Sequence, residues 1–235
     1  MPISYIGAGS EVQTSTTTLT LAGHASSQAG DIHVALIISI NNGAVTAPDS
    51  TWIEISQANF TGSRGAVFCK RLTATGAGSY DFTVAGTTTS FGIVAAFRGC
   101  KTTGNPFGAV TTSSNVSADA VTYATITPHN SSGQLVAVGL YAEDATTGGT
   151  VSGAVYTFAA PDIDVEQATL EDASIFMSLA PMTTNAASGA ITQATTSTVD
   201  AVNQGILFDL IPADAYKGGG QGEITYPKLN RRGIR

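Results

Sequence analysis

Charged side chains are scarce in this chain of 235 residues. Asp, Glu, Lys and Arg make up 11% of it, which is less than half of the roughly 25% that soluble domains usually contain. Because 43% of the residues are apolar and the mean hydropathy is +0.16, the low charge is not accompanied by the low hydrophobicity of a disordered chain. The composition therefore predicts a folded chain that is long enough to bury a sizeable core.

Cysteine and histidine are also rare, which excludes several kinds of site. Cys69 and Cys100 cannot form a disulfide framework, and no Cys-x-x-Cys spacing is present to suggest structural zinc. His24, His33 and His129 do not form a His-x-x-x-His metal motif. We therefore expect free, buried thiols and structural histidines, and we expect no metal or cofactor.

The sequence also contains little positive charge and no long hydrophobic run. Ten basic residues against 17 acidic ones give a net charge of −7, which repels a phosphate backbone, and no aromatic-plus-basic cluster offsets it. The longest nearly continuous apolar run, residues 32–40, is about half the length of a membrane span. Residues 1–7 lack the basic and apolar regions of a secretory signal. Nucleic-acid binding and membrane insertion are not expected.

Helix patterns are missing, whereas strand patterns recur along the chain. The 33 Thr and 26 Gly residues disfavour helices, because β-branched side chains lose rotamer freedom there and glycine adds backbone entropy. Twelve short runs rich in β-branched and aromatic residues are separated by turn-forming clusters, which predicts an all-β, antiparallel β-sandwich or barrel. The runs are residues 16–21, 32–40, 52–60, 66–72, 80–84, 91–97, 121–127, 134–141, 154–158, 173–179, 190–195 and 205–210.

The sequence predicts an internal repeat that divides the chain into two halves; the alternative is a chance alignment of two β-rich segments. Four segments of the first half resemble four segments of the second half in the same order, at offsets that grow from 103 to 113 residues. The repeat fits either two tandem sandwiches or one sandwich with pseudo-symmetric halves. The matched pairs are residues 27–35 with 130–138, Trp52 with Tyr156, Val67-Phe68 with Ile175-Phe176, and residues 91–94 with 204–207.

We favour the single sandwich, because six short strands per half would make a thin independent core. Residues 102–120 join the halves, and their glycines, Asn-Pro pair and Thr-Ser run fit a linker or a long crossover loop. The predicted fold is an antiparallel jelly-roll sandwich with pseudo-repeated halves over residues 1–212.

Residues 213–235 differ from the rest and are predicted to form an extended C-terminal arm. A glycine-rich spacer over residues 217–222 leads into a stretch with almost no periodicity. Residues 216–235 have a charge of +4, whereas residues 1–215 have a charge of −11. Such an arm either stays solvated or lies across a neighbouring acidic body, and its apolar residues favour docking. The predicted docking residues are Lys217, Ile224, Tyr226, Lys228, Leu229, Arg231, Arg232 and Arg235.

One acidic stretch is dense enough to suggest chemistry. Asp162, Asp164 and Glu166 alternate, and Glu171 and Asp172 follow, so several carboxylates lie on one side of an extended segment. Carboxylates placed in this way suit calcium, although the turn-forming glycine of an EF-hand loop is missing. The alternative is a solvated acidic loop or a surface that docks the basic arm. A polysaccharide-degrading enzyme would need a pair of these acids in a cleft.

Aromatic residues offer one further kind of site. If Trp52, Tyr141 and Tyr156 were exposed in loops, they would stack on sugar rings and form a glycan-binding surface. A tryptophan that enters a sandwich strand is more often part of the core because of its size. A serine nucleophile is not indicated, since the chain has no Gly-x-Ser-x-Gly elbow.

Five ordered segments of the first half carry a resemblance. They are Gly-Asp-Ile-x-Val-Ala at 30–35, Pro-x-x-x-Trp at 48–52, Val-Phe-x-Lys at 67–70, Tyr-x-Phe-x-Val at 80–84 and Ala-Phe-Arg-Gly at 96–99. The succession resembles β-sandwich or jelly-roll proteins encoded among tailed-bacteriophage structural genes. The match covers about residues 15–105, and the repeat extends it more weakly to about residue 210.

The resemblance implies a non-enzymatic virion component that assembles in the bacterial host cytoplasm, and it transfers no catalytic or cofactor-binding residue. It favours a capsid decoration or cement protein that packs on neighbouring virion subunits and docks through its arm. The alternative is a tail fibre, baseplate or receptor-binding module, to which the three aromatic residues would contribute. Symmetric oligomers are the norm for such parts. The expected partners are further copies and other virion proteins, with no nucleic acid and no membrane.

Overall fold

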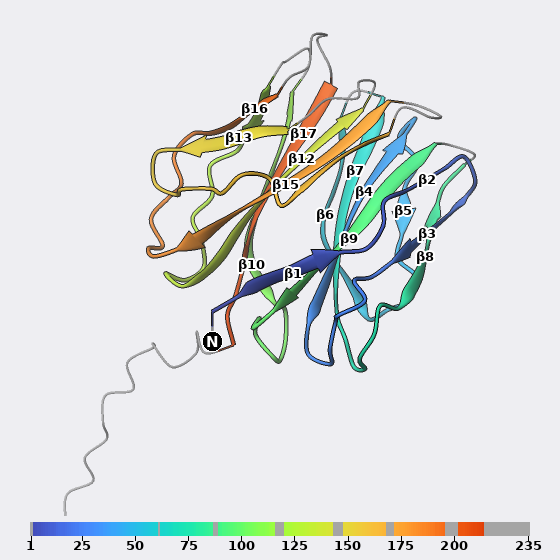
Figure 1. Cartoon of the computed structure of the whole chain (residues 1–235). Helices are drawn as coiled ribbons and strands as arrows, with labels where there is room; N and C mark the ends of the chain where they lie inside the picture. Colours follow the sequence, from blue (N-terminus) through green and yellow to red (C-terminus); the bar gives the residue numbers. More distant parts are fainter. Residues whose placement is uncertain are drawn as a thin grey trace, which may run out of the picture.

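The computed structural model describes residues 2–60, 62–86, 89–115, 120–142, 148–167, 172–195 and 202–213. In these residues the regular structure consists of seventeen β-strands (Figure 1). None of the described chain forms a helix with the length and hydrophobicity needed to cross a bilayer. The all-β prediction is confirmed.

The strands fall into two successive groups that correspond to the two halves of the sequence. The first group is β1 (Ser4–Ala8), β2 (Val12–Thr14), β3 (Thr18–Ala22), β4 (Ile32–Ile40), β5 (Val45–Thr46), β6 (Trp52–Phe60), β7 (Ser63–Arg71), β8 (Ser79–Val84) and β9 (Ser90–Arg98). The second group is β10 (Phe107–Asn115), β11 (Ala120–Tyr123), β12 (Gly133–Ala142), β13 (Gly148–Gly153), β14 (Ile163–Gln167), β15 (Ala173–Met182), β16 (Ile191–Thr195) and β17 (Val202–Leu210).

Each half forms one large and one small antiparallel sheet. The large sheet of the first half has the order β1-β9-β4-β7-β6, with β2 also paired to β9, and its small sheet has the order β3-β8-β5. The second half has the orders β10-β17-β12-β15-β14 and β11-β16-β13. With β10 in the place of β1 and β11–β17 in the places of β3–β9, the two orders are the same. The internal repeat is therefore a repeat of strand topology.

The four sheets stack in the order small, large, large, small, as the layers of Figure 1 show. The two large sheets meet in a central core to which both halves contribute. A smaller outer core lies between the large and the small sheet of each half. Each large sheet is therefore covered on both faces. Members of the central core include Val34 and Leu36 of β4, Val138 of β12, and Ile206 and Phe208 of β17.

The sequence of β4 follows from this position in the middle of the molecule. All nine of its residues are buried, with Ile32 and Val34 in the central core and Ala35 and Ile37 in the outer core. A strand that is covered on both faces needs a nearly continuous apolar run. The strands of the small sheets alternate instead, because only one of their faces is covered. In β3, for example, the leucines are buried and the threonines are exposed.

The ladders define how the halves correspond. Ile37 of β4 lies opposite Gly92 of β9, and Gly139 of β12 lies opposite Gly205 of β17. Even-numbered residues of both strands, such as Val34 and Val138, lie in the central core, so the offset between β4 and β12 is even, whereas the sequence alignment gives 103. A shift by one residue turns every core side chain of a strand to the other face. The sequence alignment of these two strands was therefore out of register.

Three further features of the fold differ from the predictions made from the sequence. The halves do not share one pair of sheets, as the single-sandwich prediction has it, because each half forms its own pair. Residues 102–120 are more than a linker, since they contain β10, an edge strand whose polar Thr and Ser residues are tolerated at a sheet edge. Residues 154–158 form no strand, and Tyr156 and Phe158 reach the outer core from a loop. From residue 214 the predicted arm lies outside the described residues.

The substitution Ile206→Ala tests the shared central core. Ile206 is fully buried between the large sheets, so the smaller side chain should lower the free energy of unfolding by about 2–5 kcal/mol. Since both halves contribute to this core, calorimetry should show one unfolding transition that moves as a whole to lower temperature.

Val155→Ala provides the matched control. Val155 is 41% exposed, and its truncation should change the free energy of unfolding by less than about 0.5 kcal/mol. Two separate transitions in the wild-type protein, of which Ile206→Ala moved only one, would contradict a core common to both halves.

Candidate functional site

The ring of Trp52 is packed inside the outer core of the first half. The residue lies at the start of β6 and is 6% exposed. Its ring makes edge contacts with Tyr80 at 4.9 Å and Phe82 at 5.1 Å between centroids, and the Lys70 ammonium lies 5.8 Å from its centroid. Trp52 is therefore a core residue and has no free ring face for a sugar.

The two predicted tyrosines are buried in the second half. Tyr141 is 0% exposed, and its ring centroid lies 5.5 Å from that of Phe176. Tyr156 is 3% exposed, and its hydroxyl donates to the carbonyl oxygen of Ala186 at 2.7 Å. Neither ring has the exposed face that stacking on a glycan requires. The eight predicted docking residues, from Lys217 to Arg235, lie outside the described residues, so their docking stays a prediction.

A buried hydrogen-bond network joins Ser27, His33 and Tyr80. His33 lies on β4, with Nε2 at 2.8 Å from Ser27 Oγ and Nδ1 at 2.9 Å from the Tyr80 hydroxyl. The Tyr80 hydroxyl also donates to the Ala77 carbonyl at 3.3 Å. A neutral imidazole satisfies the whole set, because Nδ1–H donates to the Tyr80 oxygen and Nε2 accepts from Ser27.

This network has the spacing of a nucleophile and its base, but it is closed to substrates. Ser27 and His33 are both 0% exposed. Burial is the largest influence on His33 and lowers its pKa from 6.5 to about 4, while nearby Asp31 opposes the shift. No local sequence pattern reveals this network, because its members are 6 and 47 residues apart.

Charges in the first half are paired within the body. Asp31 is almost fully buried and accepts two hydrogen bonds from Arg98 of β9, from Nε at 2.9 Å and from Nη2 at 2.8 Å. On the surface, Lys70 Nζ forms an ion pair with Asp49 Oδ2 at 3.0 Å. Hydrogen bonds from Thr51, with a smaller effect from Lys70, lower the pKa of Asp49 to about 2. These groups hold strands and loops of the first half together.

The second half has a different electrostatic character. Asp209 of β17 is buried, and its Oδ2 accepts from the backbone N–H of His129 at 2.9 Å. Burial raises the pKa of Asp209, which opposes ionisation, and the backbone donors partly offset this effect. Its buried position on β17, an interior strand of the large sheet, identifies it as a structural group.

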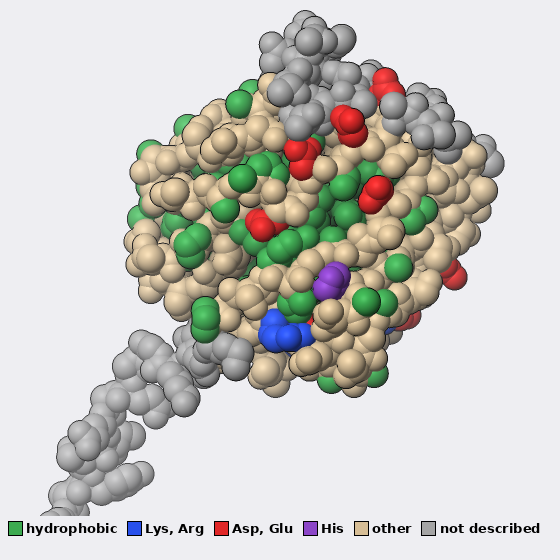
Figure 2. All heavy atoms as spheres, in the orientation of Figure 1, with side chains coloured by type: hydrophobic (Ala, Val, Ile, Leu, Met, Phe, Trp, Pro, Cys, Tyr) green, Lys and Arg blue, Asp and Glu red, His purple; other side chains and the backbone are tan. Residues whose placement is uncertain are grey.

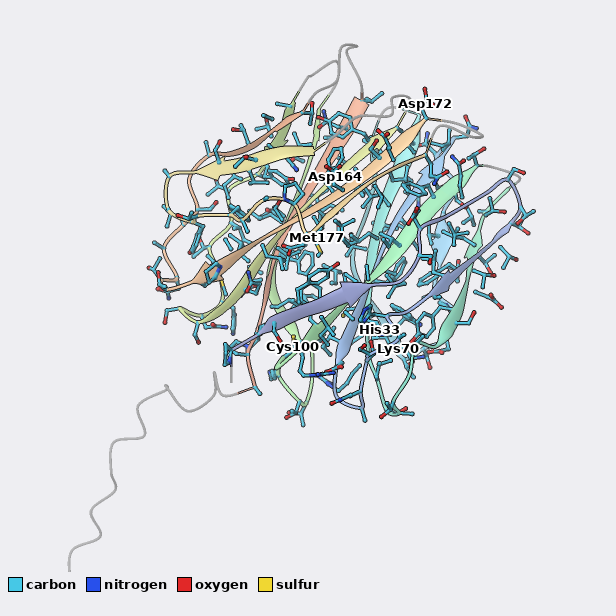
Figure 3. The ribbon with its side chains drawn as sticks, viewed as in Figure 1. His33, Lys70, Cys100, Asp164, Asp172 and Met177 are labelled. Carbon is cyan, nitrogen blue, oxygen red and sulfur yellow. The ribbon has the colours of Figure 1, made fainter. Side chains whose placement is uncertain are left out.

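The predicted acidic stretch contributes an exposed surface beside β14, which we call the β14 acidic face. It consists of the exposed residues Asp162, Asp164, Glu166 and Asp172. Asp164 and Glu166 alternate along β14, and the backbone N–H of Gly148 donates to Asp164 Oδ1 at 3.1 Å. Figure 3 places Asp164 and Asp172 toward the same end of the second half. Figure 2 shows acidic side chains on this side of the molecule around patches of hydrophobic surface.

The geometry of the described residues does not support the calcium interpretation. Across these residues, no group of three or more His, Cys, Asp or Glu side chains is arranged to hold a metal ion. Glu171, which the sequence analysis included in the stretch, lies outside them. The acidic stretch is therefore interpreted as a surface that is either solvated or docks a basic segment.

No family model, curated protein or solved structure matches this chain. The function is therefore inferred from the residues and surfaces of the chain itself.

Acid should destabilise the fold through His33. Between pH 6.5 and pH 4 the unfolded chain protonates this side chain while the folded chain keeps it neutral, so stability falls as the pH falls. The shift from 6.5 to about 4 corresponds to a loss of at most ~3 kcal/mol. Urea unfolding at several pH values measures it.

The variant His33→Gln separates this effect from the titration of carboxylates. It should be less stable than the wild type at pH 7, and the difference should shrink as the pH is lowered to 4. A difference that stayed constant over this range would show that His33 does not cause the acid sensitivity.

Proposed function

We propose that this chain is a non-enzymatic structural protein of a tailed-bacteriophage virion, a capsid decoration or cement protein that packs on neighbouring subunits. The observation that supports this most directly is the repeated topology, in which two halves of identical strand order are packed back to back around one core. This architecture fits the resemblance of the first half to jelly-roll proteins of phage structural genes.

Each half is proposed to be a jelly roll. The chain moves repeatedly between the two sheets of a half, with β3, β5 and β8 in the small sheet and β4, β6, β7 and β9 in the large one. Eight-stranded jelly rolls are built in this way from two Greek keys that close both sheets on one core. The equivalent strands of the second half follow the same path, which supports the same assignment there.

The state of the reactive side chains favours a structural role over catalysis. Ser27 and His33 are buried and satisfied by each other and by Tyr80. Cys69 and Cys100 are buried free thiols, and burial raises the pKa of each to about 12, which disfavours the nucleophilic thiolate. In the part of the chain that the structure describes, these groups stabilise the fold.

The same considerations weigh against a glycan-binding tail module. Its candidate aromatic residues, Trp52, Tyr141 and Tyr156, are all core residues. A position in the tail, as a fibre or baseplate component, remains the alternative location within the virion, and it would use the same packing surfaces.

Deletion of residues 218–235 tests the part of the arm in this function. The truncated chain should be absent from purified particles when it replaces the wild type, because the segment supplies the contacts with the neighbouring subunit. Mass spectrometry of gradient-purified particles measures its incorporation.

Circular dichroism and thermal melting provide the control, since the described core ends at residue 213 and the truncated chain should fold like the wild type. Truncated protein found in particles at wild-type levels would refute docking through the arm. Wild-type protein that never copurified with particles would refute the virion role.

A further inference from the structure

Charge is distributed unevenly between the two halves and the C-terminal segment. Residues 1–101 contain five acidic and five basic residues, so they are neutral overall. Residues 102–216 contain eleven acidic residues and no Lys or Arg. Residues 217–235 contain five basic residues and one acidic residue. The excess negative charge of the body therefore belongs entirely to its second half.

This distribution leaves the β14 acidic face without cations from its own half. In the first half, Arg98 is available for Asp31 and Lys70 for Asp49. The second half has no such side chain for Asp162, Asp164, Glu166 or Asp172. A basic segment that covered this face would add cationic contacts that the second half lacks, although each exposed pair contributes little alone.

The backbone at this place also suits an added strand. β14 is the edge strand of the large sheet, and within the described residues it pairs on one side only, with β15. An edge strand presents unpaired N–H and C=O groups that bind an extended segment by β-augmentation. Val165 of β14 is half-buried at the margin of the central core and offers apolar contact beside the acidic residues.

The C-terminal segment has the matching chemistry. Ile224 and Tyr226 alternate in the manner of a strand, and Lys228, Arg231 and Arg232 follow them. Pro227, which lies between Tyr226 and Lys228, lacks a backbone N–H donor. Such a residue is tolerated in a strand at the outer edge of a sheet.

The segment begins at the end of the sheet opposite to Asp172 of the β14 acidic face. Ala213 donates its backbone N–H to the Gly99 carbonyl at 2.9 Å, which fixes the chain beside the Leu210 end of β17. Asp172 lies at the other end of the same sheet, because Ala173 is level with Val202 through β12. Figure 3 likewise shows Cys100, which bridges to Pro212, far from Asp172. The two ends are about 27 Å apart along the strands, a distance that the eleven residue steps from 213 to 224 could also span within one copy. The choice of a second copy therefore follows from the proposed packing function.

We infer that residues 217–235 of one copy bind along the β14 edge of a neighbouring copy, with their basic side chains over the β14 acidic face. The inference rests on the proposed packing function and names its partner as a second copy of the same chain. Because the donor end and the acceptor end of a copy are different surfaces, the contact is heterologous and builds rings or filaments.

Photo-crosslinking of the full chain tests the inference in solution. A variant Tyr226→p-benzoylphenylalanine is prepared in ¹⁴N and ¹⁵N forms, mixed in equal amounts and irradiated. The crosslinked peptides should come from residues 148–182, and half of the crosslinks should join a ¹⁴N peptide to a ¹⁵N peptide. Crosslinks within single chains only, or crosslinks to the first half, would overturn it.

Two charge-matched variants show whether the acidic face is responsible. Asp164→Asn with Glu166→Gln should reduce the yield of mixed-isotope crosslinks about fivefold, because it neutralises two exposed carboxylates of the face. Glu54→Gln with Asp81→Asn removes the same charge from exposed positions in the first half and should leave the yield unchanged. Equal losses in both variants would mean that net charge alone drives association.

The experiment also separates this inference from the proposed function, since it contains no particles. Mixed-isotope crosslinks at β14 from a protein that never joined particles would support the inference and refute the virion role. Particle incorporation without such crosslinks would refute the inference and leave the virion role intact, with another virion protein as the partner of the arm.

Discussion

The contact between the two large sheets is the constraint on which the other features depend. Each of these sheets is antiparallel, and a sheet of this kind commonly leaves one face to solvent. Here the inner face packs on the other half and the outer face packs on a small sheet. The central strands must therefore be apolar on both sides, which explains why β4 is buried along its whole length. Polar and charged residues are largely displaced to the small sheets, the edge strands and the loops, with exceptions such as His33 of β4 and Asp209 of β17, which are buried.

This displacement explains where recognition can occur. Some polar side chains inside the body are bonded to partners there, as with His33 between Ser27 and Tyr80 and Asp31 with Arg98. The exposed faces of the small sheets present mainly threonine and other neutral groups, as β3 illustrates. Carboxylates collect at the margin of the second large sheet, where β14 is the last strand in the order of the described residues. Charged groups that a partner could recognise therefore lie at the edges of the sheets more than on their exposed faces.

Periodicity revealed the strands that are strongly apolar, and it was least informative where a residue's surroundings come from distant segments. The bounds of β4 and β6 were predicted correctly, since an apolar run between turn residues leaves little choice. The polar edge strand β10 was predicted as a connection because its pattern is that of a loop. Residues 154–158 were predicted as a strand because of their apolar and aromatic side chains. In the structure they form a loop whose Tyr156 side chain packs into the outer core, and this depends on distant segments that a local pattern does not show. The charge difference between the halves is present in the sequence. The strand topology shows that the acidic excess lies in the half that forms the second pair of sheets.

The position of β17 between two other strands determines how the body would resist a pulling force at its C-terminal end. β17 lies inside its sheet, with antiparallel ladders to β10 on one side and to β12 on the other. Tension applied through the C-terminal end would pull β17 along its own axis, so both ladders would be loaded in shear and their hydrogen bonds would have to fail together. A terminal edge strand pulled across its ladder would instead open one bond at a time. A tether attached to this end is thus anchored in the most force-resistant direction that a β-sheet provides.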